Sequence, residues 1–334
     1  MAARPGNAKH AYMNAPSALT RSLPLRAGTR GSPLALVQTR TFIRLLSAAC
    51  PDLQGPDRVV ESIINTTGDA VQDRPLAEIG GKGLFAKEIH EALLDGRCDF
   101  AVHSLKDLET ELPPGIILGC VLKREDPRDA LILGPDLTGS AADPLAALPY
   151  GALVGTSSVR RQAQLLHARP DLKMAILRGN VQTRLRKLGE GACQASLLAL
   201  AGLNRLDMIV PNALPLDPSV MLPAAAQGIV GITVRAADTD LRETLALVED
   251  ADARVAAEAE RAMLACLDGS CRTPIGGHAR LLPDGTVELK GLVARADGSF
   301  LLRRTETGAR ADAARLGREL GNSLRADSPA DLFG

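Results

Sequence analysis

Hydrophobic and polar residues follow two different periods along the chain, and these periods predict strands and helices in turn. The segment LRAGTRGSPLALVQTRTFIRLL has the pattern of a short strand, a glycine-bearing loop and an amphipathic helix. Ser32 is suited to the N-cap of that helix and Pro33 to its first position. RVVESIIN is predicted as a strand, GLFAKEIHEALLDG as a helix closed by Gly96, and DFAVHSL as a strand that leads directly into the dipeptide KD. The pattern indicates an alternating α/β lobe.

A second segment repeats this plan after the turn-rich stretch KREDPRDA. ALVGTSS and KMAILRG are predicted as strands, and VRRQAQLLHA and NVQTRLRKL as the helices that follow them. AAAQGIVGITVR, from Ala224 to Arg235, has a strand pattern, and we expect it to cross back into the first lobe. Two lobes linked by two crossings leave a cleft between them, the usual ligand position in α/β architectures.

The pattern changes near Asp252 and predicts a smaller domain. A helix from Ala253 to Leu267 is followed by HARLLPDGTVELKGLVARADGSFLLRRTE, which predicts three antiparallel strands joined by Asp-Gly turns, and a helix near Ala311 to Leu324 ends the domain. The predicted fold is two periplasmic-binding-protein-like α/β lobes around a cleft, plus a C-terminal α+β domain with a three-stranded antiparallel sheet. The predicted ranges are 1–24 for a disordered extension, 25–123 with 229–246 for the first lobe, 128–222 for the second lobe, and 251–334 for the last domain.

Composition narrows the possible functions. The 39 acidic and 39 basic residues balance, and Trp is absent, so neither a basic field nor aromatic stacking indicates a nucleic-acid partner. No apolar run approaches the ~18 residues of a membrane span. The first 24 residues mix Arg, Ser, Ala and Pro as an organellar transit peptide does, but the arginine-rich composition of the whole chain favours a short bacterial extension. We therefore expect a cytoplasmic protein that binds neither nucleic acid nor membrane.

The cysteines indicate a reducing compartment. Six are scattered without a CxxC pair and without clustered histidines, so neither a disulfide framework nor a zinc site is expected. Cys271 differs from the others because it lies in the turn-forming segment LDGSCRTPIGGHA, directly after a predicted helix. The residues alone leave two interpretations equal: a turn thiol that projects toward the cleft, or a buried inert cysteine.

Arginine outnumbers lysine 31 to 8, and it gathers where predicted loops meet predicted helices. The arginines at these junctions are Arg30, Arg160, Arg161, Arg178, Arg184 and Arg205. Helix N-termini present free N–H groups to an anion, and hydroxyl groups are available there from Ser32, Thr156, Ser157 and Ser158. The cleft is therefore predicted to bind a polyanion, although a solvated helix face would explain Arg184 and Arg186 equally well.

Two further stretches contain candidate side chains for the cleft. GGKG lacks the Lys-Ser/Thr ending of a phosphate loop, so Lys82 is better understood as one more cation in a glycine-rich loop. HSLKDL places Asp107 at the end of a hydrophobic strand, where a carboxylate can stabilise a positive intermediate or transfer a proton. A helix cap or an ion pair with Lys106 is an equally good interpretation of Asp107, and His103 is expected in the core.

Eight motifs in register resemble the porphobilinogen deaminase family. They are TRGSPLALVQT, GGKGLFAKE, AVHSLKDL, REDPRDA, GTSSVRRQAQL, LRGNVQTRLRKL, AQGIVGI and GSCRTPIG, from about Leu25 to at least Ala294. The resemblance implies a three-domain, monomeric transferase of tetrapyrrole synthesis. Such an enzyme joins four porphobilinogen units head to tail, with loss of ammonia, into linear hydroxymethylbilane, which is released by hydrolysis.

The resemblance also implies roles for individual residues. Cys271 would carry a dipyrromethane primer through a thioether, and Asp107 would assist ammonia loss and stabilise positive charge on the pyrrole nitrogens. The residues implied to bind the cofactor are Lys106, Thr156, Ser157, Ser158, Arg160, Arg161 and Arg184. Those implied to bind the substrate are Arg30, Ser32, Lys82, Arg178, Arg205 and Gln227.

The chain departs from the family pattern at two positions, and other protein classes fit less well. Ser270 stands where many members have glycine, and Glu78 where some have lysine. A periplasmic solute-binding protein would need a signal peptide with an apolar segment, which the N-terminus lacks. A phosphate-handling transferase would need a metal-binding acidic pair, and Asp107 followed by Leu108 does not supply one.

Overall fold

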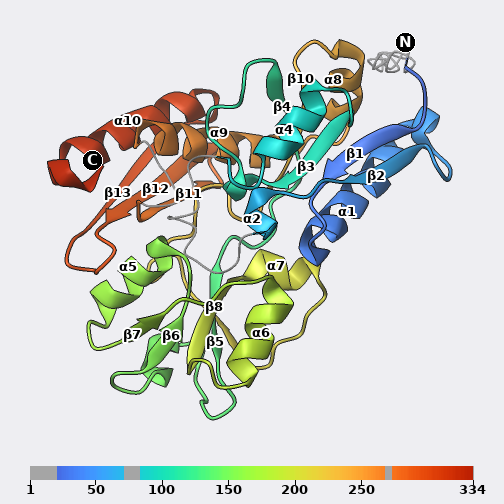
Figure 1. Cartoon of the computed structure of the whole chain (residues 1–334). Helices are drawn as coiled ribbons and strands as arrows, with labels where there is room; N and C mark the ends of the chain where they lie inside the picture. Colours follow the sequence, from blue (N-terminus) through green and yellow to red (C-terminus); the bar gives the residue numbers. More distant parts are fainter. Residues whose placement is uncertain (1–20, 71–82, 268–272, 334) are drawn as a thin grey trace, which may run out of the picture.

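The computed structural model describes residues 21–70, 83–267 and 273–333, and their strands form three sheets (Figure 1). Two sheets have five strands each and the third has three. The predicted fold class, two α/β lobes and a smaller α+β domain, is confirmed. The strands of each sheet fall within one predicted domain range, and the boundaries of those ranges stay a prediction.

The first lobe is built on a sheet with the strand order β2-β1-β3-β10-β4, in which β10 is antiparallel to both of its neighbours. Its strands are β1 (Leu25–Thr29), β2 (Val59–Ile63), β3 (Phe100–Ser104), β4 (Ile116–Val121) and β10 (Val230–Arg235). Its helices are α1 (Pro33–Ala49), α2 (Thr67–Ala70), α4 (Lys87–Leu94) and α8 (Thr239–Ala246), with short 3-10 turns η1 (Pro51–Leu53) and η2 (Leu105–Asp107).

Successive side chains of a strand point to opposite faces of the sheet, so this lobe has two apolar clusters, one on each face. Phe100 packs edge-to-face on Phe42 of α1, with ring centroids 5.3 Å apart, in one cluster. The next residue, Ala101, faces a second cluster that includes Ile89 and Leu93 of α4. Helices therefore cover both faces of the sheet, as its nearly continuous hydrophobic strands require.

The second lobe repeats this topology with the strand order β7-β6-β8-β5-β9, and here β5 is the strand antiparallel to its neighbours. Its strands are β5 (Asp129–Leu133), β6 (Leu153–Gly155), β7 (Lys173–Ala175), β8 (Ala195–Ala199) and β9 (Ala213–Pro215). Its helices are α5 (Val159–Ala168), α6 (Val181–Gly189) and α7 (Leu200–Arg205), with the 3-10 turn η3 (Pro144–Ala147). In each lobe the antiparallel strand adjoins a crossing between the lobes.

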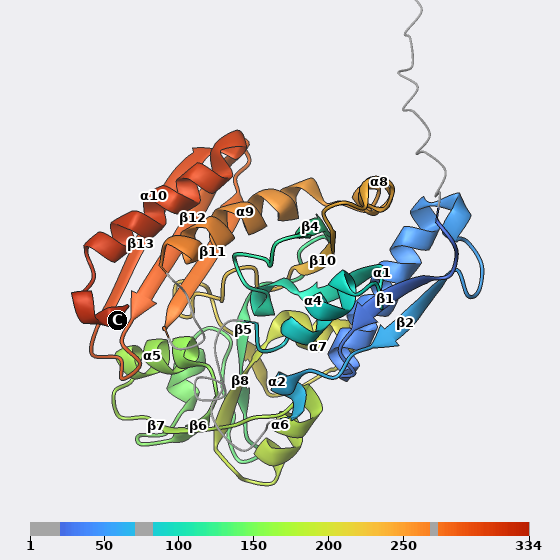
Figure 2. The ribbon, with the colours of Figure 1, turned by 45° about the horizontal axis from the view of Figure 1, so that its top comes forward.

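The C-terminal domain packs two long helices on one antiparallel sheet (Figure 2). Met263 and Leu320 from the two helices share an apolar cluster with Leu289 and Val293 of the sheet. The elements are α9 (Ala251–Cys266), β11 (Ile275–Leu281), β12 (Thr286–Ala294), β13 (Leu301–Ala309) and α10 (Ala313–Ala326), with the 3-10 turns η4 (Arg310–Asp312) and η5 (Ala330–Leu332).

One buried carboxylate joins the two crossings to the C-terminal domain. Glu260 of α9 has no exposed surface and accepts hydrogen bonds from Arg124 Nη1 at 2.5 Å and Nη2 at 3.3 Å. It also accepts from the backbone N–H of Ala226 at 2.5 Å and of Ala279 at 2.6 Å. Arg124 belongs to the first crossing, Ala226 to the second and Ala279 to β11, so a single side chain fixes their relative positions.

Most of the predicted elements are confirmed, with one clear displacement. α5 spans the predicted residues, and AAAQGIVGITVR does return to the first sheet as β10. The helix predicted from Gly83 begins only at Lys87, because Gly83 has a φ of +87° and the intervening residues form turns. That helix ends as predicted, with Gly96 in the left-handed region at φ +68°.

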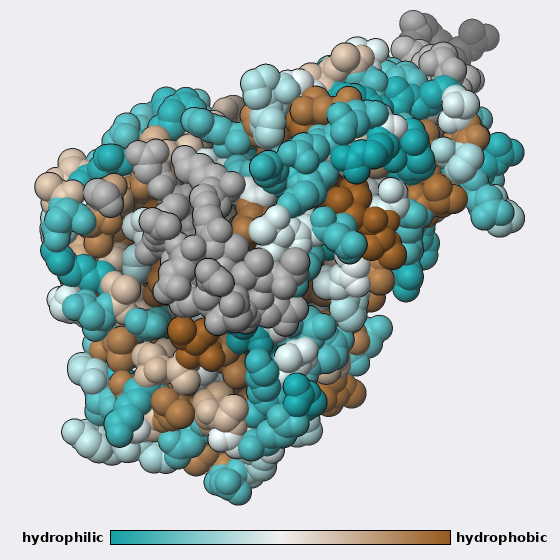
Figure 3. Space-filling model, in the orientation of Figure 1, coloured by the Kyte–Doolittle hydropathy of each residue, from teal (hydrophilic) through white to brown (hydrophobic). Residues whose placement is uncertain are grey.

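Hydrophobic residues on the surface are dispersed. On the face shown in Figure 3 they lie in separate patches among hydrophilic residues. Within the described ranges, no helix combines the length and the apolar character needed to cross a membrane.

Candidate active site

The first lobe contributes an arginine held between two carboxylates. Arg30 follows β1 directly, and its guanidinium donates to Asp69 from Nε at 3.0 Å and from Nη2 at 2.5 Å. Its Nη1 lies 4.0 Å from Asp107 Oδ2. Burial acts to lower the pKa of Arg30, but the hydrogen bond to Asp69 and the attraction of Asp107 outweigh it and raise that pKa. The arginine is therefore a fixed positive charge beside Asp107.

Arg30, Ser32 and Asp107 line one small cavity of about 70 Å³. The ring of Phe85 lies under the guanidinium of Arg30 at 4.1 Å, which favours the cation by interaction with the aromatic face. Asp107 is about one-third exposed at the end of η2. A ligand in this cavity would contact a carboxylate, a guanidinium and an aromatic ring together.

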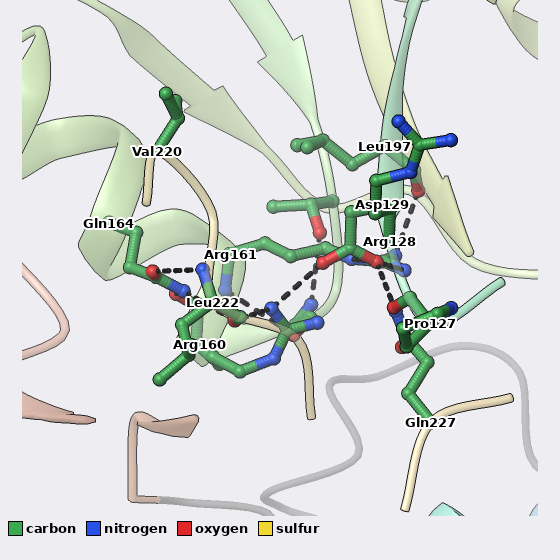
Figure 4. Close-up of polar contacts among 12 residues, drawn as sticks. Pro127, Arg128, Asp129, Arg160, Arg161, Gln164, Leu197, Val220, Leu222 and Gln227 are labelled. Atoms are coloured by element: carbon green, nitrogen blue, oxygen red, sulfur yellow. Dashed lines mark hydrogen bonds and ion pairs between the residues drawn. The ribbon is translucent and has the colours of Figure 1, made fainter. Parts of the chain in front are cut away.

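Two arginines of the second lobe share one buried carboxylate (Figure 4). Arg160 and Arg161 occupy the first turn of α5, and both pair with Asp129 at the start of β5. Arg160 Nη1 lies 2.8 Å from Oδ2, and Arg161 Nη2 lies 2.7 Å from Oδ1. Burial opposes ionisation of Asp129, but attraction by the two arginines outweighs it and holds the pKa of Asp129 well below its usual range. Two cations thus share one anion.

Lys106 connects the two lobes. Its Nζ donates to Gln227 Oε1 at 3.2 Å, while Gln227 Nε2 donates to Asp129 Oδ1 at 2.8 Å. The Lys106 side chain reaches the solvent of the cleft, yet the surrounding protein desolvates it. This desolvation, together with repulsion by Arg161 and Arg160, lowers the pKa of Lys106 to about 8.

The remaining predicted arginines extend this positive region. Arg184 on α6 donates from Nε to the carbonyl of Gly179 at 2.8 Å, and desolvation and repulsion by Arg161 lower its pKa to about 10. Arg178 is 9% exposed and repels Arg184. Arg205 donates to the carbonyl of Gly228 at 2.7 Å, so it lies against the second crossing.

The predicted hydroxyl groups serve the helix starts. Ser32 Oγ accepts from Ala35 N at 3.4 Å and caps α1, and Ser158 Oγ accepts from Arg161 N at 3.5 Å and caps α5. Thr156 Oγ1 accepts from Ser158 N at 3.1 Å, while Ser157 is half-buried in the same turn. The two caps occupy equivalent positions in the two lobes, because they follow β1 and β6, which hold the same place in the strand orders of the two sheets.

Three of the predicted site residues require comment. Cys271 and Lys82 lie outside the described residues. Gln227 was predicted to touch the substrate, but it has no exposed surface, and its amide is used by Lys106, Pro127 and Asp129. Gln227 is buried in this structure and contacts groups that line the cleft, and its contact with the substrate stays a prediction.

Several residues of the site were not predicted. Asp69, Phe85 and Asp129 each contact a predicted arginine, and Arg261 of α9 holds the segment after Asp107. Its guanidinium donates to three successive carbonyls, those of residues 108, 109 and 110, at 3.2, 2.6 and 3.1 Å. Asp129 lay in a quoted motif, REDPRDA, but its neighbours suggested a turn. Only the paired strands show that it is buried.

Comparison with protein families identifies this arrangement. Residues 25–243 match the family model "Porphobilinogen deaminase, dipyromethane cofactor binding domain". Residues 255–326 match the model "Porphobilinogen deaminase, C-terminal domain". The chain belongs to the porphobilinogen deaminase family. The predicted family, the transferase class and the role in tetrapyrrole synthesis are thereby confirmed.

Curated members of the porphobilinogen deaminase family are similar over nearly the whole chain. The porphobilinogen deaminase of Nitratidesulfovibrio vulgaris strain Miyazaki F is 49% identical over 92% of this chain and 93% of its own length. That of Paracoccus denitrificans is 47% identical over 93% and 96%. The chloroplastic enzyme of Oryza sativa subsp. japonica is 48% identical over 92% and 85%.

Solved structures with similar lobes include periplasmic proteins. A periplasmic binding protein from Brucella ovis with glutathione bound has a TM-score of 0.40 and 16% identity, covering 73% of this chain and 68% of that one. An arginine-specific periplasmic binding protein of Salmonella typhimurium has a TM-score of 0.36 and 15% identity, covering 72% and 96%.

Proposed function

We propose that this protein condenses four porphobilinogen molecules stepwise, head to tail, on a dipyrromethane primer bound to Cys271 through a thioether. Ammonia is released at each step, and hydrolysis frees linear hydroxymethylbilane. The family supports the overall reaction. The charges of the cleft support the assignment of roles to individual residues.

The excess of positive charge in the cleft is the observation on which the proposal depends. Among the described residues, six of the cationic side chains predicted for the cleft lie there with three carboxylates, Asp69, Asp107 and Asp129. The cations are Arg30, Lys106, Arg160, Arg161, Arg178 and Arg184. Desolvation, together with repulsion by neighbouring arginines, lowers the pKa values of Lys106 and Arg184. An anionic ligand beside these two groups would stabilise their charged forms.

Dipyrromethane fits these cationic side chains because each of its two pyrroles carries an acetate and a propionate. We assign the primer carboxylates to Lys106, Arg160, Arg161 and Arg184, with hydroxyl and backbone donors from the 156–158 turn. Within the described residues, Arg160 uses only Nη1 for protein contacts, which leaves Nε and Nη2 for a ligand. Charge-assisted hydrogen bonds contribute about 1.5–3 kcal/mol each, so several would hold the growing chain between steps. When bound, the primer supplies the pyrrole end that is extended.

The substrate carboxylates are assigned to Arg30, Arg178 and Arg205, with Ser32 and Lys82 as further donors. Asp107 is proposed to accept hydrogen bonds from pyrrole nitrogens and to stabilise positive charge there as ammonia leaves. Within the part of the chain that the structure describes, Arg30 is the one cation that pairs with it, at 4.0 Å, and Arg30 also pairs with Asp69. Asp107 therefore keeps its negative charge available to a cationic ligand.

We also propose that the protein acts as a cytoplasmic monomer. In the described ranges, the exposed large hydrophobic side chains are Leu45, Ile63, Leu94, Tyr150, Ile176, Ile209 and Leu247. They come from different elements of both lobes and do not form one apolar face of the kind that a stable dimer buries.

Intact mass spectrometry of the purified protein tests the primer assignment. We expect an excess equal to two pyrrole units that disappears in Cys271→Ala and remains in Cys266→Ala. Cys266 is a free thiol at the end of α9 and serves as the matched control. An unmodified mass in a fully active protein would refute the covalent primer.

A further inference from the structure

We propose that Asp129 and Gln227 form a positioning pair that couples the cationic groups of the two lobes. Asp129 holds the guanidinium groups of Arg160 and Arg161, and Gln227 links the carboxylate of Asp129 to the ammonium of Lys106 by two hydrogen bonds. The inference rests on the proposed function, because it concerns how the cleft keeps its cations ready for carboxylate ligands.

The hydrogen-bonding groups around Asp129 define its role. Its carboxylate has no exposed surface, so it contacts no ligand. Oδ1 accepts from Arg161 Nε at 3.2 Å, from Arg161 Nη2 at 2.7 Å and from Gln227 Nε2 at 2.8 Å. Oδ2 pairs with Arg160 Nη1 at 2.8 Å. The two arginines are adjacent in sequence and repel each other, so the shared anion between them fixes both orientations (Figure 4).

Gln227 is oriented by its own chemistry. Nε2 faces two acceptors, the carbonyl of Pro127 at 2.7 Å and Asp129 Oδ1 at 2.8 Å. An amide nitrogen can only donate, so Oε1 must point the other way, where it accepts from Lys106 Nζ at 3.2 Å. The side chain therefore spans from the second lobe to the first and has no exposed surface through which it could serve a ligand directly.

Charge connects these contacts to Lys106. The charged groups that act on its ammonium are Asp107 of η2, Asp129 of β5, and Arg160 and Arg161 of α5. The two carboxylates raise the pKa of Lys106, whereas desolvation and the two arginines lower it to about 8. Without the charge of Asp129, both guanidinium groups would act on Lys106 uncompensated. The ammonium would then lose its proton at a lower pH.

The pH dependence of kcat/KM for porphobilinogen tests the coupling. Lys106 binds primer carboxylates only while it is cationic, so wild-type activity should fall as pH rises through its pKa, which the bound primer raises above the value of about 8 that the protein groups alone produce. This fall should be absent in Lys106→Arg, because arginine stays charged. In Asp129→Asn the fall in kcat/KM should occur at a pH that is lower by on the order of one unit, because Lys106 loses the attraction of one nearby negative charge. Gln227→Met should also lower the pH at which kcat/KM falls, but by a smaller amount.

An exchange of the carboxylate and the amide between positions 129 and 227 tests whether the pH effect comes from the negative charge or from a change in packing. The double variant D129N/Q227E returns a carboxylate to the same buried site and places it against Lys106, while the carbonyl of Pro127 loses its donor. We expect the fall in activity to return to the wild-type pH or above it. Glu258→Gln removes an exposed carboxylate of α9 and serves as the control, which should leave this pH unmoved.

The outcomes are distinguishable. Wild-type protein that releases no ammonia from porphobilinogen would overturn the proposed function. An active wild type in which D129N and Q227M leave the midpoint unmoved would overturn the coupling alone. The coupling would also be overturned if the pH midpoint moved in D129N and did not return in D129N/Q227E. If D129N does not fold, Q227M, which retains Asp129, decides.

Discussion

Replacement of Glu260 by glutamine should destabilise the whole protein, because this side chain ties both crossings to the C-terminal domain. The substitution keeps the shape and replaces one carboxylate oxygen by an NH₂ group. That group would face either Arg124 Nη2 and the N–H of Ala226, or Arg124 Nη1 and the N–H of Ala279. In both cases a donor meets donors at a position with no exposed surface.

The size of the effect follows from these contacts. One buried backbone N–H loses its acceptor, which costs about 1–3 kcal/mol, and one charged hydrogen bond worth about 1.5–3 kcal/mol is lost. Arg124, whose side chain is 13% exposed, keeps its charge without a counterion. The expected loss of unfolding free energy is therefore about 3–5 kcal/mol, as for other broken buried ion pairs.

Scanning calorimetry measures this loss as a fall in Tm. At roughly 2–4 °C per kcal/mol, the fall should be about 6–20 °C. Glu258→Gln is the matched control, because Glu258 lies on the same helix and is exposed, so its Tm should stay near that of the wild type. A Glu260→Gln protein that melts with the control would refute the argument that the buried carboxylate organises the three domains.

Three further substitutions test other parts of the structure. Asp107→Asn should keep the primer mass and the fold but lose turnover by about 10²–10⁴-fold, measured as ammonia release, and near-normal release would remove Asp107 from the chemistry. Arg160→Leu should lower the fraction of primer-bearing protein and the yield of product, whereas Arg186→Leu, on an exposed helix face, should change neither. Gly228→Ala should be strongly destabilising, because Gly228 has a φ of +88° and an added Cβ would lie 2.3 Å from the carbonyl oxygen of Glu125 in the other crossing. The control Gly189→Ala, where no atom lies within 4 Å of the added Cβ, should keep its Tm or raise it slightly, and equal Tm values for the two variants would contradict this account.

Local sequence patterns predicted helices and strands well where a capping or turn residue marked their ends. α5 begins after the Ser158 cap and ends at the last residue of its amphipathic pattern, as predicted. The strand predicted as KMAILRG is shorter, since only Lys173–Ala175 pair with β6. Pairing depends on a neighbour that is distant in sequence, which the pattern of a single strand does not contain.

The candidate site, like the helices and strands, could be predicted from the sequence only in part. The motifs by themselves determined the family, the cluster of arginines, and the candidates Asp107 and Cys271. The tertiary structure alone decided which charges meet. It brought Asp69 to Arg30 and Asp129 to Arg160 and Arg161, and it buried Gln227 between Lys106 and Asp129.

The physical reason is the range of the interactions involved. Caps, turns and periodicity act between residues a few positions apart, so the sequence of this protein contains them directly. Burial and charge compensation act between segments far apart in the chain: Gln227 reaches Lys106 across 121 residues and Asp129 across 98. The sequence alone therefore determined which groups could bind a polyanion, and folding decided which of them are held in position, which are neutralised and which remain for the ligand.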